Sequence, residues 1–229
     1  MAAVIRGRRY NHRMSTATEK LDDNMERASR ALGDMDYLTC EALCLEALAE
    51  ARRRRSFKYY ARVLMPLQEA KRQRRMIASQ GEVRLGTSDG GFDPDAWLAD
   101  RQAGCIVLTR PFTAEDAKAL VRGAREQKKF IEVLFADNAP DSAKWTLRSY
   151  DGPAVSCQVP APGSGRPPAQ DPAQWFLDAT ERLGDAALSG VDETLTGEAL
   201  ILDLEARLRV FPDHELLHQR LAEAARGAG

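Results

Sequence analysis

The pattern of apolar and polar residues divides the chain into segments with different periodicities. Residues 1–35 are polar and charged, which predicts a tail that is disordered or partly helical. From Tyr37 apolar residues recur at helical spacing and cover most of the helix surface. One predicted face carries Leu38, Ala42, Leu45 and Ala49. This first helix of the segment 36–80 is therefore predicted to be largely buried.

A second amphipathic helix follows the arginines at positions 52–55. Because the connection is short, the two helices are predicted to be antiparallel, with Ser56 as the N-cap of the second. Pro66 predicts a kink or the start of a new helix. The basic residues of the last turns are predicted to point outward: Lys71, Arg72, Arg74 and Arg75.

Residues 81–159 combine short apolar runs with one helical pattern, which predicts a small mixed sheet. The runs at 104–109 and 130–135 are predicted strands joined by a helix that Thr113 caps. Such a βαβ unit has parallel strands and a right-handed crossover. A run at 82–85 predicts a further strand, and alternating segments around Asp-Gly-Pro at 151–153 predict a β-hairpin.

The last part of the chain is predicted to be a linker followed by helices. Residues 160–171 are rich in proline and glycine, and 172–229 return to helical spacing with Asp171 and Asp213 as N-caps. The predicted fold class is α+β. It comprises an N-terminal α-helical hairpin, a central small mixed β-sheet with one βαβ unit and a β-hairpin, and a C-terminal helical segment.

The helical spacing is similar to that of a tetratricopeptide repeat at five positions: Leu38, Ala42, Leu45, Ala61 and Pro66. The Pro-Asp-His sequence at 212–214 resembles the junction between two such repeats. The match covers about one repeat of roughly 34 residues and part of another. This resemblance implies a helical hairpin that stacks on other helices and binds peptides or protein partners.

Composition is ordinary for a globular protein, with 44% hydrophobic and 29% charged residues. No apolar run approaches the roughly 20 residues of a membrane span, so no membrane partner is expected. Four cysteines without paired spacing favour free thiols in a reducing cytoplasm. Residues 1–13 carry four arginines and no acid, which predicts a disordered leader, with either Met1 or Met14 as the start.

Charge is distributed unevenly, although the net charge is only −1. Residues 37–80 contain ten basic and four acidic side chains, whereas 160–229 contain six basic and twelve acidic ones. This complementarity predicts that the two helical parts pack together or pair between subunits. No complete catalytic set is present and no cofactor is expected. The leading prediction is a non-enzymatic interaction or scaffold protein with a protein partner or self-association.

Nucleic-acid binding is the first alternative. Clustered cations can neutralise phosphates, and tyrosines can stack on bases. The candidate residues are Arg52, Arg53, Arg54, Arg55, Lys58, Tyr59, Arg62, Lys71, Arg72, Arg74 and Arg75.

A zinc-dependent hydrolase is the second alternative. The sequence at 214–218 matches HExxH, in which His214 and His218 could bind zinc while Glu215 activates water. A different candidate position lies past the carboxyl ends of the predicted strands, where ligands gather in sheets with βαβ units. The residues there are Thr109, Arg110, Asp137 and Asn138.

Overall fold

The computed structural model describes residues 21–87, 91–137, 142–163 and 171–229. A helical segment at 21–33 precedes the helices α2 (Tyr37–Arg53) and α3 (Phe57–Ser79). The predictions for residues 1–20, for Asn138 and for most of the linker lie outside the described residues. The remaining helices are α4 (Pro94–Ala99), α5 (Ala114–Glu126), α6 (Pro172–Ser189), α7 (Gly197–Arg207) and α8 (Glu215–Ala228).

Five strands form one mixed sheet in the order β1-β2-β3-β4-β5. The first three strands are parallel, and β4 and β5 add to β3 as an antiparallel pair. The α+β fold class, the βαβ unit β2-α5-β3 and the β-hairpin are therefore confirmed. Their bounds are β1 (Glu82–Leu85), β2 (Ala103–Leu108), β3 (Phe130–Asp137), β4 (Lys144–Arg148) and β5 (Ser156–Pro160).

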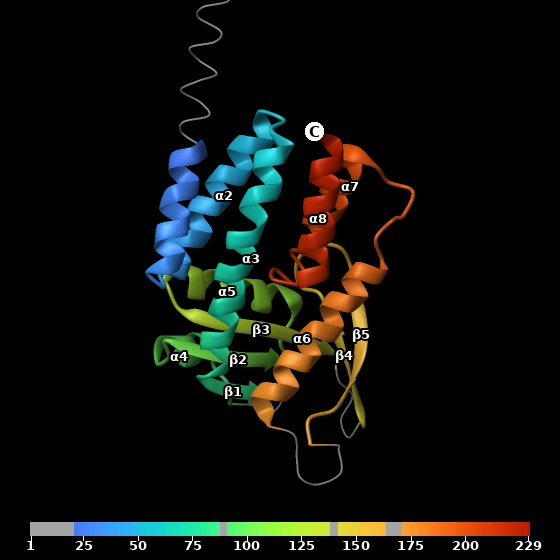
Figure 1. Cartoon of the computed structure of the whole chain (residues 1–229). Coiled ribbons are helices and arrows are strands. Elements are labelled where there is room, and N and C mark those ends of the chain that lie inside the picture. Colours follow the sequence, from blue (N-terminus) through green and yellow to red (C-terminus); the bar gives the residue numbers. More distant parts are fainter. Residues whose placement is uncertain (1–20, 88–90, 138–141, 164–170) are drawn as a thin grey trace, which may run out of the picture.

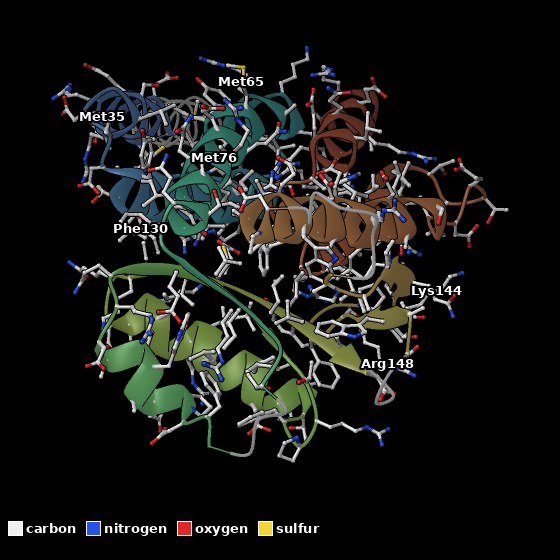
Figure 2. All side chains as sticks on the ribbon, turned by 90° about the horizontal axis from the view of Figure 1, so that it is seen from below. Met35, Met65, Met76, Phe130, Lys144 and Arg148 are labelled. Atoms are coloured by element: carbon white, nitrogen blue, oxygen red, sulfur yellow. The ribbon has the colours of Figure 1, made fainter. Side chains whose placement is uncertain are left out.

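Helices cover both faces of the sheet (Figure 2). Ile106 and Leu108 of β2 pack with α4 and α5 on one face, whereas Cys105 and Val107 face the opposite side. The opposite face joins the larger core, which includes α3 and α6. The alternation follows from the two-residue period of a strand, which lets one apolar run serve two cores.

The long helix α3 joins the helical part to the sheet (Figure 1). Its first half packs on α2, and its length brings it into contact with β2, β3 and α8. Pro66 lies inside this single continuous helix and is buried, so the helix does not restart there. Within the described residues, no helix is long and apolar enough to cross a membrane.

The prediction that α2 is largely buried is wrong for one side of the helix. Ala42, Leu45 and Ala49 are exposed. The side that packs against neighbouring helices instead carries Cys40, Leu43, Cys44, Ala47 and Ala51. An apolar helix surface does not specify which side meets the core when both sides carry small or apolar residues.

The predicted N-caps have mixed outcomes. Thr113 forms the expected capping box with Asp116, and Asp171 accepts a hydrogen bond from the first turn of α6. Ser56 occupies the N-cap of α3 without a side-chain cap bond. The assignment of Asp213 as a cap is wrong, because His214 caps α8 while Asp213 turns toward Arg75.

Candidate functional site

Carboxylates pair with seven of the eight arginines of the predicted basic surface, and the eighth, Arg62, lies over the ring of Tyr59. Arg52 and Arg55 pair with Glu205 and Glu198 around α7, so the acidic C-terminal segment does dock on the basic hairpin. The other five pairs are Arg53 and Arg54 with Glu50, Arg72 with Glu69, Arg74 with Glu41, and Arg75 with Asp213. Little unpaired charge therefore remains at these seven arginines.

The other candidates of that surface have separate environments. Lys58 and Arg62 are exposed, and the Arg62 guanidinium lies 5.1 Å from the centre of the Tyr59 ring. The Tyr59 hydroxyl donates to Asp22 at 2.6 Å, which ties the helical segment 21–33 to α3. This aromatic ring is consequently already occupied by contacts within the chain.

The prediction that Lys71, Arg74 and Arg75 point outward is wrong. Arg74 is only 6% exposed, the Arg75 side chain is 13% exposed, and Lys71 is half-buried. Arg74 meets Glu41 of α2 and Arg75 meets Asp213 before α8. Lys71 lines a cavity beside β3. Arg72 does remain exposed.

These cations belong to a group that we call the charged cluster, defined as Glu41, Lys71, Arg74, Arg75, Glu132 and Asp213. Direct ion pairs join Glu41 to Arg74 and Asp213 to Arg75, the latter at 3.0 Å. Within the described parts of the chain, Lys71 and Glu132 make no ion pair. The cluster thus holds two ion pairs and two unpaired charged groups.

Burial perturbs the unpaired groups most clearly. It raises the pKa of the Glu132 carboxyl from 4.5 to about 7, despite attraction from Arg74 and Arg75. Burial also lowers the pKa of Lys71, and repulsion from Arg125 and Arg74 adds to this effect. Both side chains keep some exposed area, but the protein atoms packed around their charged groups have the larger effect on the two pKa values. Perturbed acids and bases gathered in one place are typical of functional sites.

The histidines of the HExxH sequence are buried and turned to different partners. His218 Nε2 donates to the carbonyl of Pro212 at 2.9 Å, and burial lowers the pKa of this ring to about 4. His214 Nδ1 instead accepts a hydrogen bond from the Leu217 backbone at 3.3 Å. Glu215 is exposed and begins α8. The arrangement gives no support to a zinc site shared by both histidines.

A different group approaches His214. Its Nε2 lies 3.3 Å from Asp185 Oδ1 and 3.6 Å from Glu181 Oε1, both on α6. Among the described residues, this is the one group of potential ligands that could hold a metal ion. Because Nδ1 accepts from Leu217, the neutral ring carries its proton on Nε2. A metal ion would need a free lone pair on Nε2, and this tautomer has a proton there instead. The geometry therefore favours a hydrogen bond from Nε2 to Asp185 over metal coordination.

The predicted residues past the strand ends form structural contacts. Thr109 is fully buried, and its Oγ1 accepts from the Thr87 backbone at 2.9 Å. Arg110 pairs with Asp137 at 2.9 Å, and Arg148 approaches the same carboxylate. The structure does bring Arg110 and Asp137 together, but each one is occupied by the other.

Comparison with known proteins finds no matching family model, no matching curated protein and no matching solved structure. The tetratricopeptide resemblance therefore stays a prediction, and α2 and α3 form a helical hairpin.

Sequence reasoning missed the acidic half of the charged cluster: Glu41, Glu132 and Asp213. One signal was present, because Glu132 interrupts an otherwise apolar strand. An acid in such a strand faces either solvent or a buried cation. Which of the two applies depends on α3 and α8, which are distant in sequence.

Proposed function

We propose that the protein is a non-enzymatic interaction protein that binds a protein partner through the outer faces of α2 and α3. The observation that supports this proposal is the presence of exposed apolar side chains on these two helices. Met65 is 76% exposed and Met76 is 39% exposed. They share one face of α3, since eleven residues make about three helical turns. On α2, Leu45 is 47% exposed beside Ala42 and Ala49.

Figure 2 shows Met65 at the margin of the helical layer, pointing away from the molecule. Methionine side chains adapt to irregular partner surfaces and are frequent at protein-binding sites. Two exposed cations, Lys58 and Arg62, flank the methionines on the same helix face, beside the ion pair of Arg72 with Glu69. The partner that fits is an amphipathic helix with apolar and acidic side chains.

The ion pairs favour this proposal over nucleic-acid binding. Seven arginines already have carboxylate partners, and phosphate binding would have to displace them. Exposed methionines contribute apolar area that suits a protein surface and does nothing for a phosphate backbone.

The test compares Met65→Glu with Leu202→Glu, because Leu202 is 56% exposed and lies on α7, a helix that is not part of the proposed surface. Partners are captured by cross-linking to the full chain, purified and titrated by calorimetry. Met65→Glu should weaken binding by about tenfold or more, whereas Leu202→Glu should leave it unchanged. The proposal fails if no purified partner binds the two variants with different affinity. It also fails if the protein is retained on RNA at low salt, and this retention is lost in Lys58→Glu but kept in Met65→Glu.

A further inference from the structure

A small cavity adjoins the charged cluster at the place where α2, α3, α5, β3 and the segment before α8 meet. It lies beside the first half of β3, where this strand has no β4 neighbour, since β3 and β4 pair only from Phe135 onward. Besides cluster residues, Arg125 of α5 and Tyr150 after β4 line it. Six separate segments therefore contribute residues to one small, partly open cavity.

The charges around the cavity do not cancel by direct pairing. Glu41 pairs with Arg74, and Asp213 pairs with Arg75. Neither Lys71 nor Arg125 makes an ion pair with any residue that the structure describes. Glu132 is the remaining acid, so the unpaired groups are two cations and one carboxyl.

One unused donor belongs to a residue that lines the cavity. The Nε of Arg74 is buried and has no hydrogen-bond partner within the described residues, and the residue is only 6% exposed. A buried donor without a partner is costly and points to a missing acceptor. An anion between the unpaired cations would supply that acceptor.

We propose that the cavity binds a small oxyanion, with Lys71 and Arg125 as the charged contacts and Arg74 Nε and the Tyr150 hydroxyl as further donors. The cavity volume is about 30 Å³, which suits a group of a few heavy atoms such as a carboxylate or bicarbonate. A nucleotide or sugar phosphate would not fit inside. Any larger ligand would have to enter by its carboxylate alone.

Glu132 makes the binding depend on pH. The groups that face it are Lys71, Arg74 and Arg75 of α3, Arg125 of α5, Cys105 of β2, Glu41, Tyr150 and Asp213. Protonation of Glu132 removes the unpaired negative charge and creates an O–H donor for the anion. Since the pKa of this carboxyl is about 7, binding should tighten between pH 8 and pH 6.

The proposal is tested by calorimetric titration of the full chain with four anions: formate, acetate, bicarbonate and phosphate. Chloride keeps the ionic strength constant. The test variant is Arg125→Gln, which changes an arginine that lines the cavity. The control is Arg122→Gln, which changes an exposed arginine of the same helix that does not line it. At pH 6, Arg125→Gln should weaken formate binding by at least about tenfold, and Arg122→Gln should not change it. Stronger binding of formate than of acetate would indicate a free small anion, whereas the reverse would indicate the end of a larger carboxylate.

Glu132→Gln provides an independent readout, because a neutral amide resembles the protonated acid. This variant should bind formate as tightly at pH 8 as at pH 6, while the wild-type chain should lose affinity over that range. Equal formate binding by Arg125→Gln and the wild type, or no binding of any oxyanion above the chloride background, would overturn the proposal.

Discussion

Glu132 is the residue whose environment departs furthest from what its position in the chain suggests. It lies in β3 between the buried residues Ile131 and Val133, opposite Cys105 of β2. Its side chain faces α3, where burial outweighs the attraction of nearby arginines and raises its pKa to about 7. A carboxyl group in this state destabilises the fold when it ionises.

Glu132→Gln should therefore stabilise the protein in a pH-dependent way. Below about pH 4.5 the wild-type carboxyl is protonated in both folded and unfolded states, so the variant gains nothing. Between pH 4.5 and 7 the unfolded state loses this proton first, and wild-type stability falls as pH rises. The variant should thus be more stable at pH 8, by about 3 kcal/mol at most, in urea unfolding. Glu126→Gln, an exposed change on α5, should show no such gain.

At the scale of elements, two close contacts hold the C-terminal helices in place. Arg75 of α3 pairs with Asp213 and stacks over the Phe211 ring at 4.7 Å. On the other side, α6 approaches the segment before α8 so closely that Gly184 has no room for a side chain. A Cβ there would lie 2.3 Å from Phe211 and 2.5 Å from the His214 ring.

Gly184→Ala should destabilise the protein by about 2 kcal/mol or more, because both rings are buried and cannot move aside easily. The matched control is Gly227→Ala near the end of α8, where nothing lies within 4 Å of the new methyl group. That change should be neutral or stabilise by up to about 1 kcal/mol, through helix propensity. Thermal unfolding of the two variants compares them directly, and equal melting temperatures would contradict this packing.

At the scale of the whole molecule, one hydrophobic core extends through nearly every element. It includes Leu21 near the start of the described chain, Leu134 in the sheet and Leu221 in α8. The basic hairpin and the acidic C-terminal segment meet along it, and their exposed ion pairs contribute little beyond orientation. Apolar burial is the main force that joins them.

The chain should therefore unfold in one cooperative step in urea. Trp97 reports on the core beneath α4 and α5, whereas Trp145 and Trp175 contact each other in the larger core. In a Trp97→Phe variant, fluorescence reports on the larger core alone. Its transition should coincide with the loss of helix measured by circular dichroism, and separate midpoints would show that the parts unfold independently.

Much of the secondary structure could be predicted because short-range signals specify it. The strand at 130–135, the capping box at Thr113 and the hairpin around residues 151–153 are readable from neighbouring residues. Predictions about which way side chains point were less successful. The exposed side of α2 and the inward turn of Arg74 depend on partners far away in the chain.

The sequence by itself determined the α+β class, the order of helices and strands, and the opposite charge of two helical segments. Hydrophobic periodicity and turn residues act over a few neighbouring positions, so they can be recognised in the sequence alone. Only the tertiary structure decided which distant carboxylates meet four of the arginines, that His214 replaces Asp213 as a cap, and that Lys71 and Glu132 border one cavity. Those outcomes depend on long-range packing, which places α3 between α2, the sheet and α8.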